Sequence, residues 1–457
     1  MEDKKTVMRT LSANVRNKTF EEVELGYNDE EAKKEASRCL NCNNPRCVKG
    51  CPVNIMIPKF IEAIKNDNLN KAYEIISESS NLPSICGRVC PQEKQCEMMC
   101  IKGLKGDAIA IGSLERYVAD YARKNNIGLN NEIKENGKKT AIIGSGPAGL
   151  SCAYVLRNHG FSVTIYEILH KLGGVLTYGI PEFRLPKKIV SSEVDKLTKM
   201  GVNIITDTLI GNTITIKELQ KEYDYIFIGT GAGLPKFMGI DGEDANEVFS
   251  ANEILTRVNL MESYKDNSNT PIKTGHICYV IGGGNVAMDA VRTAKRLGMD
   301  AHLMYRRDEE SLPARKMEVV HAKEEGIIFH FLENPIKILK DDNNHVIGME
   351  TVNMQVLDEG EDGKKKIIPI EDHHNIIKCD MIIMALGTNP NTSVLNNSDI
   401  STNEKGLIIA EDSLTNLKNV YAGGDAVSGS ATVILAMEAG KKAALKIIES
   451  ENVKNSK

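Results

Sequence analysis

The stretch "TAIIGSGPAGLSCAYVLRNHGFSVTIYE", residues 140–167, decides the fold. An apolar run, a glycine-rich turn, a helical stretch and a second apolar run follow one another, as in a βαβ unit. Gly144, Gly146 and Gly149 form the pattern G-x-G-x-x-G, which can hold a pyrophosphate at a helix start. Glu167 follows Gly149 by 18 residues, close to the ~20 expected of an acid that binds the adenosine ribose. Together these features predict a dinucleotide-binding unit rather than an ordinary turn.

A second unit of the same plan lies in "HICYVIGGGNVAMDAVRTAKRLGMDAHLMYRR", residues 276–307. Its turn holds four candidate cofactor-binding residues, which are Gly282, Gly284, Asn285 and Ala287. The second strand ends in Arg306 and Arg307, where an acid would indicate NAD. Two guanidinium groups there can accept a 2′-phosphate, so NADP(H) is predicted over NAD(H). A solvent-facing basic pair is the alternative.

The segment "NVYAGGDAVSGSATVILAMEAGKKAALKIIE", residues 419–449, predicts a strand that ends in a Gly-Gly-Asp turn ahead of a helix. Asp425, after Gly424, can bind a flavin's ribityl hydroxyls, and a helix that begins near Thr432 can stabilise negative charge on the reduced ring. A plain turn is the alternative. The segment "GGVLTYGIPEFRLPK", which begins with Gly173 and Gly174, has no cysteine, unlike the corresponding region of flavin disulfide reductases.

Eight of the 11 cysteines fall within the first 100 residues. The runs are "CLNCNNPRCVKGCP", residues 39–52, and "CGRVCPQEKQCEMMC", residues 86–100. Disulfides are disfavoured in a reducing cytosol, and structural zinc sites usually show paired C-x2-C knuckles, whereas only Cys39 and Cys42 have that spacing. The compact cysteine–proline runs favour two 4Fe–4S clusters. Cys152, Cys278 and Cys379 are isolated, and we expect them to be inert; zinc is the remaining alternative for the clustered thiols.

The bulk properties exclude several classes of function. The net charge is −5 with acids and bases interspersed, which does not indicate a nucleic-acid-binding protein. No window approaches the ~18 apolar residues of a membrane helix, and the first residues lack the apolar core of a secretory signal. We therefore expect a cytoplasmic protein without membrane or nucleic-acid partners. A polar stretch over residues 130–140 reads as a linker.

The predicted fold class is α/β, with a helical domain that binds two 4Fe–4S clusters ahead of tandem Rossmann-like FAD and NAD(P)H domains, as in disulfide-reductase-like flavoproteins. Apolar residues at helical spacing between the cysteine runs predict one or two helices that hold the runs together. We expect a helical iron–sulfur domain at 1–135. The family resemblance described in the next paragraph implies an FAD-binding domain at 136–260 and 385–457, and an NADP(H)-binding domain at 265–384.

Almost the whole chain resembles the small subunit of glutamate synthase and its relatives. These relatives include the large subunit of NADH-dependent ferredoxin:NADP oxidoreductase, the flavin subunit of sulfide dehydrogenase and the amino-terminal half of dihydropyrimidine dehydrogenase. The stretches that carry the resemblance are "LPSICGRVCPQEKQCE", "GSGPAGL", "GGVLTYGIPEFRLPK", "IGGGNVAMDAVRTAKRLG", "YRRDEESLPAR" and "YAGGDAVSGSATVILAMEAGK". The cysteine runs are more similar to those of the ferredoxin:NADP oxidoreductase and sulfide dehydrogenase branch.

The resemblance implies iron ligands that are shared crosswise between the two runs, as in dihydropyrimidine dehydrogenase. One cluster would take Cys39, Cys42, Cys47 and Cys100. The other would take Cys51, Cys90, Cys96 and the oxygen ligand Glu115, which leaves Cys86 without an iron. A carboxylate is a harder ligand than a thiolate, so it should make its iron more exchangeable. A surface charge is the alternative role for Glu115.

The same resemblance implies a converter between hydride transfer and single-electron transfer. Hydride would pass between NADPH and the flavin, with Tyr178, Pro181 and Arg184 as candidate flavin contacts, and single electrons would pass through the clusters. The chain would need a partner subunit. We favour the flavin and iron–sulfur subunit of an electron-bifurcating ferredoxin:NADP oxidoreductase, with ferredoxin as a further partner. The large subunit of glutamate synthase is the alternative, and a redox-sensing or assembly subunit without turnover is an alternative of another class.

Overall fold

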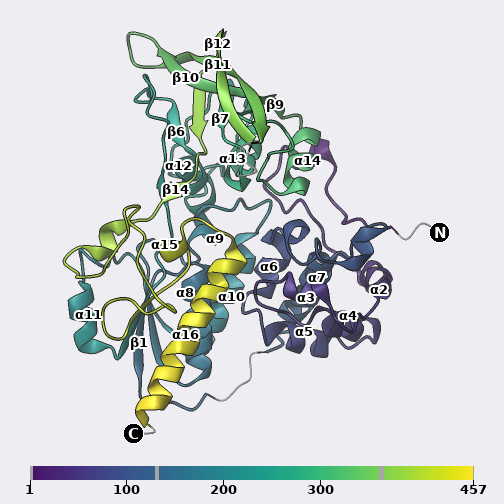
Figure 1. Ribbon diagram of the computed structural model, residues 1–457, viewed down its shortest axis with the longest axis vertical. Helices are drawn as coiled ribbons and strands as arrows, with labels where there is room; N and C mark the ends of the chain where they lie inside the picture. Colours follow the sequence, from purple (N-terminus) through teal and green to yellow (C-terminus); the bar gives the residue numbers. More distant parts are fainter. Residues whose placement is uncertain (1–3, 129–132, 360–364, 456–457) are drawn as a thin grey trace.

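The computed structural model describes residues 4–128, 133–359 and 365–455 (Figure 1). The linker expected over residues 130–140 begins outside these ranges; its described part leads into the first strand. Among the helices of the described ranges, none is long and apolar enough to cross a bilayer. The termini lie far apart, with the N-terminus beside the helical region and the C-terminus at the end of the long helix α16 (Figure 1).

The N-terminal region is helical, as expected. Helices α4 and α5 connect the two cysteine runs, and α6 begins just before the second run. Asn28 caps α2 with a reciprocal Glu31 capping box, which satisfies exposed N–H groups at the start of that helix. The elements are α1 (Ala13–Arg16), α2 (Asp29–Ser37), α3 (Arg46–Lys49), α4 (Ile57–Lys65), α5 (Leu69–Ser77), α6 (Pro83–Val89), η1 (Gln92–Lys94), η2 (Ile101–Leu104) and α7 (Ile111–Lys124).

The first α/β unit is a five-stranded parallel sheet in the order β15-β4-β1-β2-β3. Strand β15 comes from the C-terminal segment, so the chain returns to this sheet after the second unit. Helix α16 packs along α8, and the missing side chain at Gly440 permits that contact, because a Cβ there would lie 2.0 Å from the Ala148 carbonyl oxygen. The strands are β1 (Lys139–Ile143), β2 (Ser162–Tyr166), β3 (Asn203–Ile205), β4 (Tyr225–Ile228) and β15 (Val420–Ala422).

The helices of the first unit cover both the turn and the sheet. They are α8 (Pro147–Asn158), α9 (Val175–Tyr178), α10 (Lys187–Lys199), α11 (Ile216–Glu222), α15 (Asp425–Ser428) and α16 (Val433–Asn455). The chain crosses between the units twice. The two crossing segments pair with each other through short antiparallel strands, β5 (Leu234–Pro235) and β14 (Thr388–Asn389). A single 3-10 turn, η4 (Thr392–Leu395), follows the second crossing.

The second unit repeats the parallel arrangement in the order β6-β13-β7-β8-β9. Strand β6 lies within the 136–260 segment that we expected in the first unit, yet it pairs with β13. The chain therefore enters the second unit earlier than expected, because residues 248–250 complete the edge of that sheet. The elements are β6 (Val248–Ser250), α12 (Ala251–Leu255), η3 (Thr256–Leu260), β7 (Ile277–Ile281), α13 (Asn285–Arg296), β8 (Asp300–Tyr305), α14 (Lys316–Glu324), β9 (Ile328–Phe331) and β13 (Met381–Met384).

An antiparallel sheet in the order β10-β11-β12 is inserted between β9 and β13 and projects from the second unit (Figure 1). Its strands are β10 (Glu333–Lys340), β11 (Val346–Glu359) and β12 (Lys365–Ile377). The sequence patterns did not predict this sheet. With that addition, the architecture confirms the predicted class, a helical domain followed by two Rossmann-like units.

A buried ion network joins the N-terminal segment to the second unit. The Glu325 carboxylate, beyond the end of α14, accepts hydrogen bonds from the guanidinium groups of Arg16, Arg292 and Arg296. Burial by itself raises the pKa of Glu325, but the hydrogen bonds from Arg292 and Arg296 outweigh it and lower the pKa from 4.5 to about 2. The network thus contributes stability only while this carboxylate is ionised.

We predict that Glu325→Gln lowers the free energy of unfolding by about 3–5 kcal/mol, because buried guanidinium groups lose their counter-charge. Glu324→Gln is the matched control. Its side chain is 52% exposed and also pairs with Arg16, so its removal should cost less than about 1 kcal/mol. Urea denaturation at pH 7 measures both variants, and equal losses would contradict the assigned role of Glu325.

The same network predicts a pH dependence. The folded-state pKa of Glu325 lies below its value in the unfolded chain, so its contribution is complete above about pH 4.5. The contribution is lost as the pH falls toward 2. Urea denaturation between pH 6 and pH 3 should show a smaller loss of stability for Glu325→Gln than for the unsubstituted protein.

Candidate functional site

The first glycine turn fits the sequence prediction position by position. Gly144 has φ +98°, a conformation that a side chain disfavours. A Cβ at Gly149 would lie 1.9 Å from the Gly144 carbonyl oxygen, so the helix can approach the turn only with glycine at this position. Gly146 has nothing within 4 Å of an ideal Cβ. The turn therefore leaves open space above Gly146, at the N-terminus of α8, where a phosphate can bind.

Glu167 is buried at the end of β2 and faces this turn. Its carboxylate accepts hydrogen bonds from the Ser145 backbone N–H at 2.9 Å, from the Ser145 hydroxyl at 2.5 Å and from the Leu169 N–H at 2.9 Å. The structure thus places the predicted ribose acid beside the turn, where it also fixes the loop. Its contact with a ribose stays a prediction.

The 173–178 segment and the Gly-Gly-Asp turn converge on the same place. Gly174 has φ +52°, and a Cβ there would lie 2.9 Å from the Gly146 Cα. Burial raises the pKa of Tyr178 to about 12, with the carboxylates of Asp425 and Glu167 as further causes. Tyr178 therefore lies near both Asp425 and Glu167, which are far apart in the sequence.

Two polar groups of the C-terminal segment face this place with few partners. Burial raises the pKa of Asp425 to about 6, and the Ala431 N–H donates to its carboxylate at 3.2 Å. Gly424, just before it, has φ +69°. The Thr432 hydroxyl is buried without a hydrogen-bond partner among the described residues. Buried polar groups are normally bonded, so this hydroxyl is suited to a ligand that supplies the missing partner.

Arg184 does not lie free beside that place. Its guanidinium group donates to Asp289 on α13 at 2.6 and 2.7 Å and lies 3.2 Å from Glu318 on α14. These two carboxylates neutralise a side chain that is only 7% exposed. Arg184 thus links the two units, and its contact with a flavin stays a prediction. Pro181 is buried, and its carbonyl accepts hydrogen bonds from the backbone N–H groups of Arg184 and Leu185; its contact with a flavin stays a prediction.

The second glycine turn has the same geometry. Gly282 has φ +144°, and Gly284 has nothing within 4 Å of an ideal Cβ. Ala287 is fully buried, so a methyl group fits where the first unit requires glycine. Arg306 is exposed and Arg307 half-buried after β8, and within the described ranges neither forms an ion pair. The two guanidinium groups are thus available beside an open turn.

Arg315 connects the second glycine turn to the second cysteine run, a role that was not predicted from the sequence. Its backbone N–H donates to the Asn285 side-chain oxygen at 2.9 Å, beside the second glycine turn. Its guanidinium group donates to the Arg88 carbonyl at 2.7 Å and to the Gln92 side-chain oxygen at 3.2 Å, both within the second cysteine run. The stretch "YRRDEESLPAR" was the available signal, because it stood among the motifs of the family resemblance.

The eight clustered cysteines separate into two spatial sets, each drawn from both runs. We name Cys39, Cys42, Cys47 and Cys100 the outer set; all four are half-buried or exposed. Burial raises the pKa of Cys47 to about 11, followed by the charges of Cys100 and Cys39. Burial likewise raises the pKa of Cys39, with Cys100 and Cys42 as further causes. Cys100 therefore lies with the first run, although it ends the second.

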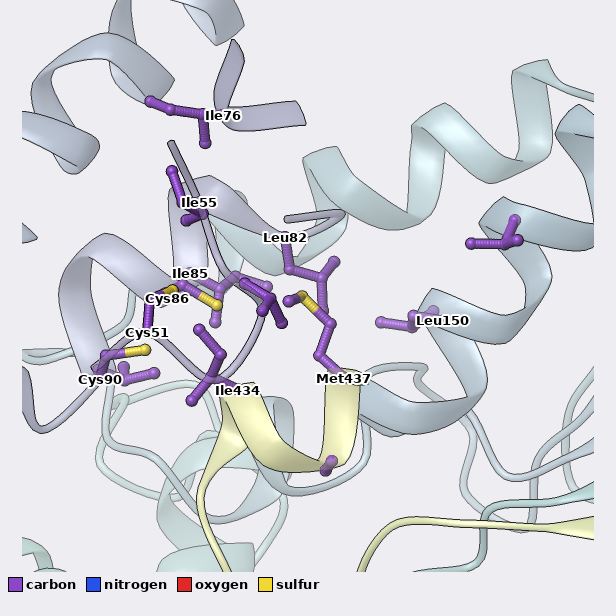
Figure 2. Packing of buried hydrophobic residues seen from close by; sticks show 14 of the residues in the cluster. Cys51, Ile55, Ile76, Leu82, Ile85, Cys86, Cys90, Leu150, Ile434 and Met437 are labelled. Atoms are coloured by element: carbon purple, nitrogen blue, oxygen red, sulfur yellow. The ribbon is translucent and has the colours of Figure 1, made fainter. Parts of the chain in front are cut away.

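We name Cys51, Cys86, Cys90, Cys96 and Glu115 the inner set; all five are buried. Burial raises the pKa of Cys51 to about 11, and Glu115 and Cys86 raise it further. A side-chain hydrogen bond with Cys86 is the main cause that raises the pKa of Cys90, followed by burial and by Cys86, Glu115 and Cys96. Figure 2 shows Cys51, Cys86 and Cys90 beside Ile434 at the start of α16.

Glu115 is the least satisfied member of the inner set. Its side chain is only 6% exposed, one carboxylate oxygen has no hydrogen-bond partner among the described residues, and burial raises its pKa to about 8. An unpaired buried carboxyl group is costly unless a cation or donor completes it. A surface charge, the alternative role, is therefore wrong.

Within the described residues, no three His, Cys, Asp or Glu side chains converge closely enough to hold a single metal ion. The donor chemistry, thiols with one orphaned carboxylate, fits an iron–sulfur cluster. Cys152, Cys278 and Cys379 lie apart in the cores of the α/β units, where burial raises their pKa and disfavours the thiolate.

The glycine geometry predicts two separable effects. Gly149→Ala should destabilise the fold by about 1–3 kcal/mol, because its methyl group meets a backbone carbonyl. Gly146→Ala should fold normally, because space surrounds that position, but the methyl group should reduce nucleotide binding. Thermal unfolding and the amount of co-purified nucleotide cofactor measure the two effects. A normal cofactor content in folded Gly146→Ala protein would contradict this location of the phosphate.

Comparisons with known proteins agree with this arrangement. The family model "Dihydropyrimidine dehydrogenase domain II, 4Fe-4S cluster" matches residues 16–127, and "Pyridine nucleotide-disulphide oxidoreductase" matches residues 138–440. The glutamate synthase (NADPH) small chain of Escherichia coli K12 is 34% identical over 94% of this chain and 93% of its own. The Azospirillum brasilense small chain is 32% identical over 94% and 91%. The NADP(+)-dependent formate dehydrogenase subunit beta of Moorella thermoacetica is 35% identical over 88% and 59%.

Solved structures share the fold of the two α/β units. FprA of Mycobacterium tuberculosis in complex with NADPH matches with a TM-score of 0.58 and 16% identity, over 70% of this chain and 86% of its own. Thioredoxin reductase of Lactococcus lactis matches with a TM-score of 0.50 and 21% identity, over 68% and 98%. With its iron–sulfur domain, its tandem nucleotide-binding units and relatives that align from end to end, the chain belongs to the glutamate synthase small-chain family of oxidoreductases.

Proposed function

We propose that the protein is an NADPH-linked flavoprotein that passes electrons between NADP(H), FAD and two 4Fe–4S clusters. The observation that carries this proposal is the position of the inner set, which packs against Ile434, two residues beyond Thr432 in the first nucleotide unit (Figure 2). A redox cofactor in that unit and a cluster in the inner set would be neighbours. When bound, FAD exchanges hydride with nicotinamide and single electrons with iron–sulfur clusters.

The first unit would hold FAD. The open turn at Gly146 would receive the pyrophosphate, and Glu167 at the end of β2 would reach the adenosine ribose. Asp425 and the unpartnered Thr432 hydroxyl would bond the ribityl chain and the ring, and Tyr178 would pack beside them. These groups come from both ends of the unit, so they would fix the orientation of the flavin before any substrate binds.

The second unit would hold NADP(H). Its open turn at Gly284 offers the N-terminus of α13 to the pyrophosphate, and Arg306 and Arg307 would pair with the 2′-phosphate. Arg184 bonds Asp289 on α13, so the "GGVLTYGIPEFRLPK" segment of the first unit is tied to the second unit. This ion pair helps to fix the position of one nucleotide site relative to the other.

Each set of cysteines would hold one cluster. The outer set has four thiols, Cys39, Cys42, Cys47 and Cys100, for four irons. The inner set would use Cys51, Cys90, Cys96 and Glu115. Both runs contribute to both sets, so neither cluster would form without the helices that join the runs. Because clustered thiols of this kind require a reducing compartment, we place the protein in the cytoplasm.

The outer set would hand electrons to a partner. It lies toward the surface, near an open depression of about 670 Å³ that Leu40, Ile101 and Leu104 line together with Lys4, Lys102 and Lys105. Asp107 also lines it, so exposed apolar side chains stand among three lysines and one acid, a surface that suits a protein partner with an acidic contact face. We favour a flavin and iron–sulfur subunit of the ferredoxin:NADP oxidoreductase type, with ferredoxin as a further partner.

The large subunit of glutamate synthase is the second candidate partner, because small chains of that enzyme align with the whole chain. Anaerobic affinity purification from the native cell decides between them. Recovery of a flavin and iron–sulfur chain supports the first partner, and recovery of an amidotransferase chain supports the second. Recovery of neither from cells in which the protein is abundant would contradict both assignments.

The function itself is tested by anaerobic mixing with NADPH. We expect rapid bleaching of the flavin absorption, followed by paramagnetic signals of reduced clusters at low temperature. A redox-sensing or assembly subunit without turnover would instead leave the flavin oxidised over the time of a catalytic cycle. That result, with flavin and iron present in full, would end the enzyme proposal.

Replacement of the basic pair tests the cofactor preference. Arg306→Ala with Arg307→Ala should weaken NADPH binding by about 10- to 100-fold, because two charge-assisted contacts with the 2′-phosphate are lost. NADH lacks that phosphate, so its binding should change little. Lys337→Ala with Lys340→Ala, a basic pair on β10 that is already bonded to acids, is the matched control. Equal losses for both nucleotides would overturn the assignment.

A further inference from the structure

The inner set has one ligand more than a cluster needs. It contains four thiols and a carboxylate, whereas a 4Fe–4S cluster takes four protein ligands, one on each iron. The fifth group is either a bystander or a second candidate for one position. The surroundings of Cys86 and Glu115 distinguish these roles.

Cys86 lies on α6 and Glu115 on α7, and these two helices contact each other beside the two residues. A Cβ at Gly87, the residue after Cys86, would lie 2.7 Å from the backbone nitrogen of Arg116, the residue after Glu115. Helices α6 and α7 therefore meet backbone to backbone at this point. Cys51 lies beside both groups, because the charges of Glu115 and of Cys86 both act on its thiol.

Cys86 is not an ordinary core cysteine. It is fully buried, and its side chain lies close enough to Cys90, the residue after the end of α6, to raise the pKa of that thiol. Cys152 offers the contrast, because it is equally buried but has burial alone as the cause of its raised pKa. A free buried cysteine normally acts as a small apolar side chain, as Cys152 does.

Glu115 supplies the independent observation. Its side chain is 94% shielded from solvent, and one carboxylate oxygen has no hydrogen-bond partner among the described residues. The Glu115 carboxyl group lies near the thiols of Cys51, Cys90 and Cys96, because its charge acts on each of them. The pocket is therefore built for a ligand, and Cys86 is a fifth donor at the same place.

We propose that Cys86 is a reserve iron ligand of the inner set, which takes the position of Glu115 when the carboxylate leaves it. This inference rests on the proposed function, because it assumes a 4Fe–4S cluster in the inner set. In the exchange an iron–oxygen bond breaks and an iron–sulfur bond forms. The proton of the Cys86 thiol passes to the Glu115 carboxylate, or to solvent in a variant that lacks this carboxylate, and no electron is transferred.

The exchange has a chemical reason. A carboxylate is a harder and more weakly held ligand for cluster iron than a thiolate, so the iron at Glu115 is the one most easily lost. A thiol that already lies in the pocket can bind that iron before it leaves. The reserve ligand thus protects the cluster next to the nucleotide site.

The test uses three variants of the full-length protein, purified without oxygen. Glu115→Ala should keep the iron content of the unsubstituted protein, because Cys86 takes the vacant position. Glu115→Ala with Cys86→Ser should lose about one iron per chain and show the electron paramagnetic resonance signal of a three-iron cluster. Glu115→Ala with Cys152→Ser, the matched control, should behave like Glu115→Ala. Loss of iron from Glu115→Ala itself would overturn the proposal.

A second measurement leaves Glu115 in place, in case its replacement prevents folding. Cys86→Ser should release its first iron to a chelator about tenfold faster than Cys152→Ser, in keeping with the loss of a supporting group at a metal site. Equal rates would overturn the reserve role.

The iron content of the unsubstituted protein distinguishes failure of the proposed function from failure of this inference. If it contains no four-iron cluster, the proposed function fails, and with it this inference. If it contains full iron and Glu115→Ala loses it, only the inference fails.

Discussion

The backbone contact between α6 and α7 at Gly87 is the constraint on which the rest of the site depends. Any side chain there would meet the Arg116 backbone within 3 Å, so only glycine lets the helices come together. That contact brings the start of the second cysteine run beside Glu115. The second run thereby contributes to the buried inner set, whereas its last cysteine, Cys100, lies with the half-buried outer set.

The inner set also lies where the helical domain contacts the nucleotide units. Ile434 and Met437 of α16 pack against the same cluster of buried residues as Cys51 and Cys86 (Figure 2). Arg315 makes a second connection. Its guanidinium group donates to the Arg88 carbonyl in the second run, and its backbone N–H donates to Asn285 beside the second glycine turn. A change at either nucleotide site therefore has a direct structural route to the iron–sulfur domain.

Much of this could be predicted from the sequence, because glycine turns and cysteine spacing are local patterns with a single geometric solution. The crosswise sharing of cysteines needed the family resemblance, since spacing by itself does not say which run a thiol joins. The ion pairs of Arg184 were not predicted, because its partners, Asp289 and Glu318, are over 100 residues away in the sequence. The inserted sheet at 333–377 was missed because its strands alternate like any strand and carry no motif.

The central claim is that the two mixed sets hold two 4Fe–4S clusters, of which the inner one has an oxygen ligand. Mössbauer spectroscopy of protein enriched in ⁵⁷Fe and prepared without oxygen tests it most directly. The account predicts about eight irons per chain in two four-iron clusters, with one iron of one cluster distinct from the rest. Zinc in place of iron, or a single four-iron cluster, would contradict it.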